Sequence, residues 1–170
     1  YDLDLKYSIN SNRLLGRARI TIRPTDTLAR VSFDLAGLRV AKATVGGRAA
    51  RWQQRAEKVR VEPAASLPAG RIVDVEFRYQ GTPGPTSSVW GPVGWEELTD
   101  GVLVASQPSG ASTWFPCNDL ARQKASFRVA VTTSSAYRVV VNGSLRSRRS
   151  SGSTTTWVYE QPEPTSPYLM

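Results

Sequence analysis

The sequence predicts a nearly all-β domain, built mainly from antiparallel strands and packed as a β-sandwich. Apolar residues recur at every second position through much of the chain, and turn-forming residues separate these runs at short spacing. No long window shows the 3.6-residue period of an amphipathic helix. Alternation places one face of each strand on a core and the other in water, so we expect stacked sheets.

The predicted strands follow one another along the whole chain. Alternating runs cover residues 1–9, 18–22, 31–35, 59–61, 73–79, 127–131 and 137–141. Turn signals lie at residues 10–12, 46–47, 68–70 and 142–143. The last signal, Asn142-Gly143, predicts a β-hairpin turn. With Ser144 it also matches an N-glycosylation acceptor, which we consider the weaker interpretation.

Two stretches break the alternation. Residues 81–101 are rich in Gly and Pro and hold Trp90 and Trp95, which predicts a long irregular connection kept in order by its two indole rings. Residues 107–124 form the second break, where a short helical turn is predicted after Asn118, a good N-cap residue.

Composition limits the classes of function. The 170 residues are enough for one domain, and 40% hydrophobic with 21% charged residues is ordinary for a globular protein. The net charge of +8 comes from 18 Arg and 4 Lys against 14 acidic residues. Such a surplus can mark a nucleic-acid surface, but only Arg146, Arg148 and Arg149 cluster, so we predict no nucleic-acid partner. No apolar run approaches the roughly 20 residues that span a bilayer.

The chain lacks the residues of a metal centre or a catalytic triad. It has no histidine, and Cys117 is its single cysteine. Catalytic zinc is usually held by three protein ligands, histidine foremost, and a serine or cysteine nucleophile usually needs a histidine partner. We therefore predict no catalytic residue, metal ligand or cofactor within these residues. One cysteine excludes an internal disulfide and leaves a cytoplasmic or a secreted bacterial location open.

A set of short motifs, taken together, resembles a known family. Residues 115–119 read F-P-C-x-D and residues 124–127 read K-A-x-F. Further matches are Y-D-L-D-L at 1–5, L-G-R-A at 15–18, F-D-L-A-G-L at 33–38, V-N-G at 141–143, Trp157 and P-Y-L at 167–169. Their order and spacing resemble the amino-terminal domain of M1 zinc aminopeptidases over essentially the whole chain. One departure is that residues 120–122 lack the proline usual in the family.

The resemblance implies a saddle-shaped β-sandwich that packs on a thermolysin-like catalytic domain. In the family, the zinc motif HExxH and the exopeptidase motif GxMEN lie carboxy-terminal to this region, and neither occurs here. We therefore expect residues 1–170 to form a single non-catalytic domain of a larger peptidase, with zinc held by a catalytic domain that is not part of this sequence. That catalytic domain and the amino terminus of a peptide substrate are the expected partners.

The resemblance also points to one substrate-binding residue. Gln107 matches the position that helps to hold the substrate's free α-amino group, with Ala105 and Ser106 in the cleft wall. Many relatives have a second glutamine where this chain has Ala105. Alternatively, Gln107 satisfies backbone groups in a proline-flanked turn.

Other conspicuous residues have structural interpretations. We expect Cys117 to be a small buried apolar group, and Trp114 and Phe115 to pack in the core. Asp119 is expected to accept backbone N–H bonds or to pair with Arg122 or Lys124. An alternative function is an independent β-sandwich binding module for a carbohydrate or protein ligand, with Trp90 and Trp95 as exposed stacking platforms. The terminal residues 167–170 are expected to lie at an apolar docking patch with an unpaired edge.

Overall fold

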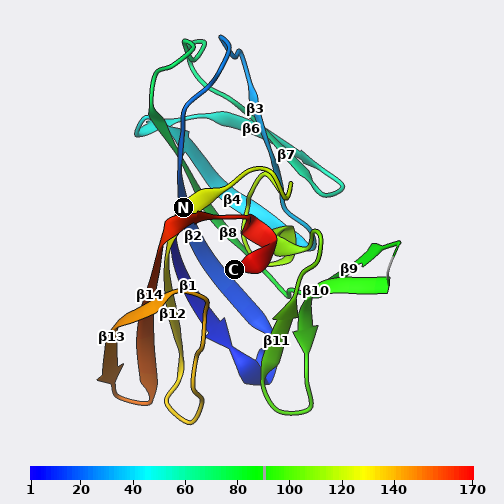
Figure 1. The fold of residues 1–170 in the computed structure, drawn as a ribbon, viewed down its shortest axis with the longest axis vertical. Coiled ribbons are helices and arrows are strands. Elements are labelled where there is room, and N and C mark those ends of the chain that lie inside the picture. The colour runs from blue at the N-terminus through cyan, green and yellow to red at the C-terminus, as the bar shows by residue number, and fades with distance from the viewer. Residues whose placement is uncertain (90) are drawn as a thin grey trace.

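The computed structural model describes residues 1–89 and 91–170 and is nearly all-β (Figure 1). Its large sheet contains, in spatial order, β13 (Ser144–Ser151), β14 (Thr154–Thr165), β12 (Ala125–Ser134), β1 (Asp2–Ser8), β2 (Arg13–Ile22), β8 (Val73–Gly81), β4 (Leu38–Val45) and β5 (Arg48–Ala49). One small sheet contains β11 (Val102–Ala105), β10 (Gly91–Glu97) and β9 (Pro85–Ser88); the other contains β3 (Val31–Asp34), β7 (Lys58–Glu62) and β6 (Arg51–Arg55). The ladders are antiparallel except for β1 with β12.

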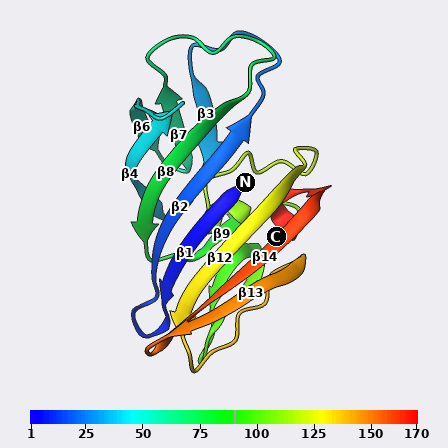
Figure 2. The ribbon, with the colours of Figure 1, turned by 90° about the vertical axis from the view of Figure 1, so that its left-hand side faces the viewer.

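The two small sheets pack on one face of the large sheet, which confirms the predicted layered, mainly antiparallel architecture. Figure 2 shows the strands of the large sheet side by side with the small sheets behind them. Phe33 of β3 meets Phe77 of β8 edge-on, with ring centroids 5.1 Å apart. Trp95 of β10 meets Tyr7 of β1 in the same way at 4.9 Å. These contacts join both small sheets to one hydrophobic core.

A single glycine explains why the L-G-R-A motif matters to this core. Gly16 of β2 lies opposite Tyr79 of β8 in the ladder. A Cβ atom on residue 16 would lie 2.2 Å from the Tyr79 ring, closer than real atoms approach. The ring is 2% exposed, and its hydroxyl donates a hydrogen bond to the Trp114 carbonyl at 3.0 Å. Gly16 thus makes the space for a tyrosine that ties the large sheet to residues 106–124.

The predicted strand at 137–141 and the hairpin turn at Asn142-Gly143 are wrong. Residues 138–141 belong to no ladder, Asn142 and Gly143 form a bend, and the turn between β13 and β14 contains Gly152. The alternation in this segment is real, because Tyr137, Val139 and Val141 are half-buried while their neighbours are exposed. A half-buried extended segment gives that period whether or not another strand pairs with it.

Three further predictions are corrected. Residues 81–101 contain β9 and β10 instead of an irregular connection, and Trp95 is buried there, while Trp90 lies outside the described residues. The helical turn comes before Asn118, as the 3₁₀ turn η2 (Ala111–Thr113), and not after it. The terminal segment is the 3₁₀ turn η3 (Pro167–Leu169) and not a strand edge. By contrast, the turn predicted after β1 is present, as the 3₁₀ turn η1 (Ile9–Ser11).

The sequence analysis missed β4, and the ladder shows why. Its pairing with β8 shifts register between Val40 and Lys42. This bulge interrupts the two-residue period on which the strand prediction depended.

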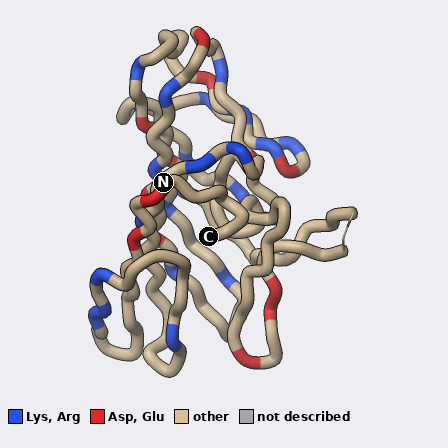
Figure 3. The backbone as a smooth tube through the Cα atoms, in the orientation of Figure 1, with Lys and Arg blue, Asp and Glu red and all other residues tan. Residues whose placement is uncertain are grey.

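The charged residues are spread over the whole molecule. Lysines and arginines occur at both ends and along the sheets, interspersed with acidic residues (Figure 3). Within the described chain, no helix is long and apolar enough to cross a membrane.

We predict that Gly16→Ala destabilises the fold by about 1–3 kcal/mol, because the new methyl group must displace the buried Tyr79 ring. Urea denaturation followed by tryptophan fluorescence measures the change. Gly84→Ala is the matched control, since a Cβ atom there meets nothing within 4 Å. Equal stability of the two variants would contradict the proposed role of Gly16.

Candidate functional site

The residues singled out for substrate binding lie together where β11 ends. Ala105 is the last residue of β11 and pairs with Gly94 of β10. Ser106 follows as a half-buried residue, and Gln107 is exposed and joined to Pro108 by a cis peptide bond. The structure therefore presents Gln107 to solvent on a short connection between β11 and η2.

The backbone of β10 packs closely against the connection between β11 and η2. Gly94 has a φ of +98°, and a Cβ atom on it would lie 2.4 Å from the Thr113 hydroxyl oxygen and 2.8 Å from the Gly110 carbonyl oxygen. The Thr113 hydroxyl donates to that carbonyl at 2.6 Å and accepts from the Trp95 backbone N–H at 3.0 Å. Because only glycine permits this contact, β10 and the connection after Gln107 are held as one unit.

Asp119 fixes the other end of the connection. Its Oδ2 atom accepts hydrogen bonds from the backbone N–H groups of Gly110 at 2.8 Å and Ser112 at 3.2 Å. Its own N–H donates to Oδ2 of Asp34 at 3.1 Å. The prediction that Asp119 accepts backbone N–H bonds is thus confirmed. Pairing of Asp119 with nearby cations, which the sequence left open, is not seen among the described residues.

Two of the family-like motifs contact each other directly. Asp34, in F-D-L-A-G-L, exchanges backbone hydrogen bonds with Cys117, in F-P-C-x-D, at 2.7 and 3.1 Å. The Ala36 N–H donates to the Ser112 carbonyl at 2.9 Å, and the Asp34 carboxylate pairs with Lys58. The segment behind Gln107 is therefore bonded to the end of β3.

The aromatic and sulfur groups of this segment are structural, as predicted. Trp114 is 4% exposed, Phe115 and Cys117 are fully buried, and the two rings meet edge-on at 4.4 Å. Burial raises the pKa of the Cys117 thiol well above its usual value, and the nearby Asp119 and Asp34 carboxylates raise it further. The thiol is therefore protonated at neutral pH and unsuited to nucleophilic or metal-binding chemistry.

The Gln107 amide is available to a ligand. Throughout residues 1–89 and 91–170 its side chain has no hydrogen-bond partner, so the alternative role of satisfying local backbone groups is not observed. Its oxygen can accept and its nitrogen can donate. The sequence analysis proposed Gln107 by resemblance but did not identify Gly94 and Thr113, which hold the connection that follows it. A glycine inside a strand, beside Trp95, was the available signal of a close backbone approach.

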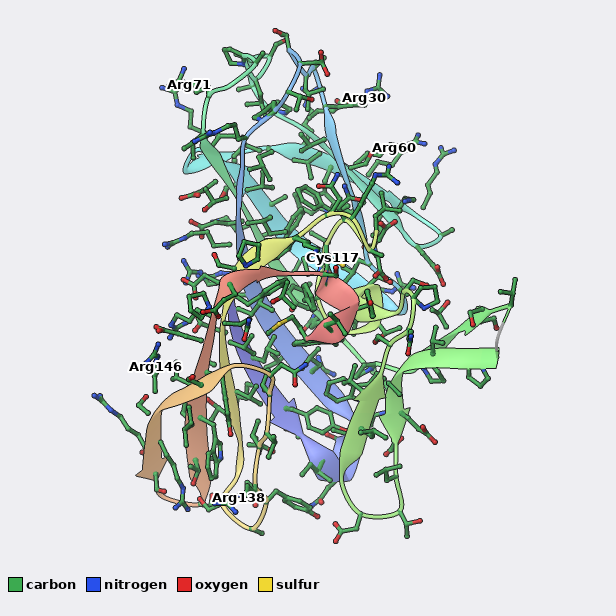
Figure 4. All side chains as sticks on the ribbon, viewed as in Figure 1. Arg30, Arg60, Arg71, Cys117, Arg138 and Arg146 are labelled. Carbon is green, nitrogen blue, oxygen red and sulfur yellow. The ribbon has the colours of Figure 1, made fainter. Side chains whose placement is uncertain are left out.

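The structure disfavours the other proposed ligand surfaces. Trp95 is 6% exposed, so the prediction of an exposed stacking platform at this residue is wrong; Trp90 lies outside the described residues. The side chains of Arg30, Arg60 and Arg71 point outward at one end of the molecule, while two other labelled arginines lie toward the opposite end (Figure 4). Among the described residues, no group of three or more His, Cys, Asp or Glu side chains could hold a metal ion.

Comparison with known proteins identifies one family. The model of the peptidase M1 N-terminal domain matches residues 1–169. A solved M1 zinc metallopeptidase from Deinococcus radiodurans is similar, with a TM-score of 0.92 and 28% identity over 98% of this chain and 39% of that chain.

Two ligand-bound structures are similar to the same extent. One is a mutant of the Deinococcus radiodurans enzyme bound to a Tyr-Ser-Ala substrate, and the other is a two-domain M1 zinc metallopeptidase mutant bound to L-arginine. Each has a TM-score of 0.93 and 28% identity, over 98% of this chain and 39% of its own. This chain therefore spans about two-fifths of the solved relatives' length. No curated protein matched it.

We predict that Thr113→Val destabilises the domain by about 1–3 kcal/mol, because it leaves the buried Trp95 N–H without its acceptor. Chemical denaturation measures this change. Thr21→Val is the control, since it removes one exposed hydrogen bond to Asp74. An equally small effect of both substitutions would refute the supporting role of Thr113.

We also predict that Cys117 resists thiol reagents in the folded protein at pH 7 to 8, because its pKa lies well above that range and its side chain is buried. Ellman's reagent should react fully only after denaturant is added. Rapid reaction under native conditions would show that the segment around Cys117 opens readily.

Proposed function

This chain belongs to the peptidase M1 N-terminal domain family, and on that premise we propose that it is the non-catalytic amino-terminal domain of a larger zinc aminopeptidase. In this proposal residues 1–170 form a single domain that packs on a catalytic domain and supplies one wall of the substrate cleft. Gln107 in that wall binds the α-amino group of the peptide. The observation that carries the proposal is an exposed amide with no partner in the described chain, on a backbone held by Thr113 and Asp119.

The chemistry of the amide suits an ammonium group. An α-ammonium offers three N–H donors, and the Gln107 side-chain oxygen can accept one of them. A hydrogen bond to a charged group contributes about 1.5–3 kcal/mol, which corresponds to roughly one to two decades in affinity. Ala105 has no polar side chain, so the position at which many relatives carry a second glutamine provides no acceptor here.

The proposed hydrogen bond between Gln107 and the substrate ammonium would also position the peptide bond that is cleaved. An anchored amino group places the first peptide bond at a fixed distance from Gln107, which favours removal of single amino-terminal residues. A mobile anchor would lose that advantage, because catalysis needs the bond held close to its reactive geometry. The glycine contact and the Asp119 hydrogen bonds limit such movement. The similarity to an M1 enzyme bound to a Tyr-Ser-Ala substrate supports a peptide as the ligand.

The residues of this chain do not fit the zinc ion that its family implies. The sequence has no histidine, and its one cysteine is fully buried with a raised pKa. We therefore assign zinc and the activation of water to the catalytic domain of the larger protein. The proposed function of residues 1–170 is to bind and orient the α-amino group of the peptide substrate.

We predict that Gln107→Ala in the larger enzyme raises KM for an aminoacyl substrate about 10- to 100-fold through loss of the hydrogen bond to the ammonium. Gln107→Glu should lower KM, because a carboxylate binds an ammonium more strongly than an amide does. Steady-state kinetics with an aminoacyl-4-nitroanilide measure both changes.

Gln53→Ala, an exposed glutamine on β6, is the control and should leave KM unchanged. Unaltered KM and kcat/KM in both Gln107 variants would remove this residue from the substrate site.

A further inference from the structure

A row of three cations crosses the outer face of the large sheet, which is turned toward the viewer in Figure 2. Arg17 of β2 lies directly opposite Arg78 of β8, and Arg78 lies directly opposite Lys42 of β4. Like charges at directly opposite positions of neighbouring strands destabilise a sheet. The row therefore works against the stability of the fold, and positions of this kind are where a binding role is expected.

Only one cation of this row has carboxylate partners. Arg17 pairs with Asp4 at 3.2 Å and with Glu76 at 3.1 Å. Arg78 and Lys42 are exposed, and neither forms an ion pair with any described residue. Their charges are therefore available to an anionic group from outside the chain.

The neighbouring row of the same face adds two cations. Lys6 of β1 lies opposite Leu15, and Arg39 of β4 lies opposite Gln80, which itself pairs with Leu15. Lys6 and Arg39 are exposed and have no ion pair in the part of the chain that the structure describes. The carboxylate of Asp4 is the acidic group nearest to these cations in the ladder, and two arginines already share it. This part of the face is therefore strongly positive.

The charged side chains border a hollow of about 670 Å³ that is partly apolar. Leu15, Ala130 and Val158 lie in its lining, and Leu15 is 41% exposed. The only aromatic residue of the lining is Tyr79, which is 2% exposed. A ligand that fills this hollow therefore needs apolar groups as well as negative charge.

Arg78 stands between two hollows. With Arg17 it lines both the large hollow and a smaller one of about 260 Å³, to which Lys42 also contributes. An extended ligand that follows the row of cations therefore contacts both hollows.

We propose that this face binds an extended acidic segment of another protein. Carboxylates of the segment would pair with Arg78, Lys42 and Lys6, and its small apolar side chains would cover Leu15. Charge-assisted hydrogen bonds from arginine and lysine to carboxylates are among the stronger polar contacts that proteins make. Binding would also remove the repulsion within the row, because each cation would gain an opposite charge.

The chemistry of the face favours this occupant over other anions. Single-stranded nucleic acid is usually held by exposed aromatic rings on which bases stack, and the hollow exposes no such ring. The surface of an anionic bilayer is flat, whereas these cations surround a hollow. A second copy of this chain would bring a net charge of +8 toward a positive surface.

Fluorescence anisotropy of a labelled peptide of alternating Glu and Val tests the proposal. The 170-residue chain should bind this peptide, more weakly as salt is added, because salt screens exposed charges. A peptide with Gln in place of Glu should bind at least about tenfold more weakly, since it offers no charge. Equal binding of the two peptides would overturn the proposal.

Arg78→Glu separates a binding role from a structural one, because the two effects have opposite signs. The substitution should weaken peptide binding at least about tenfold, since it reverses the charge at the centre of the row. It should raise the melting temperature of the free chain by about 1–4 °C, because opposite charges replace like charges on both sides. Arg30→Glu is the matched control and should leave peptide binding unchanged, because Arg30 points outward at one end of the molecule (Figure 4).

Three results would overturn the proposal while leaving the role of Gln107 to its own kinetic test. The first is an equal effect of the Arg78 and Arg30 substitutions on peptide binding. The second is tighter, Arg78-dependent binding of oligothymidylate or of phosphatidylserine vesicles, which would assign the face to another class of anion. The third is peptide binding by the 170-residue chain but not by the complete gene product, which would show that the face is covered within the same protein.

Discussion

The reciprocal backbone hydrogen bonds between Asp34 and Cys117 are the constraint on which the candidate site depends. They attach the segment after Gln107 to the end of β3, which itself packs on the large sheet. The Asp34 carboxylate adds a bond to the Asp119 N–H, and the Asp119 carboxylate holds Gly110 and Ser112 in turn. A chain of hydrogen bonds thus runs from the core to the connection that carries Gln107. This arrangement gives a physical reason for two family motifs to occur in one protein.

The stability of the domain comes from its core more than from its charged surface. On the outer face of the large sheet, Arg17 bridges Asp4 and Glu76, and Arg128 bridges Asp2 and Asp4. These side chains are 30–44% exposed, and ion pairs at such sites contribute little. The buried rings of Phe77, Phe115 and Tyr79 contribute more, because each removes a large apolar area from water. The arginines of these ion pairs therefore add little to the stability of the fold.

The β10–β11 hairpin leads directly into the connection that carries Gln107. β11 ends at Ala105, two residues before Gln107, and is the outer strand of its sheet. The Asn12 and Tyr137 hydrogen bonds restrain the hairpin near its turn, at Glu97 and Asp100.

The sequence by itself determined the class of fold, the structural roles of Cys117 and Asp119, and the strands β1, β2, β3, β7, β8 and β12. These features depend on local patterns, namely the two-residue period and a short motif with a buried thiol and a turn-forming carboxylate. The sequence did not predict the long strands β4, β13 and β14. Tertiary structure decided that residues 137–141 are not a strand, that Trp95 is buried, and that Gly94 and Thr113 support Gln107. Periodicity is a property of one segment, whereas pairing, burial and close approach depend on which distant segment lies opposite.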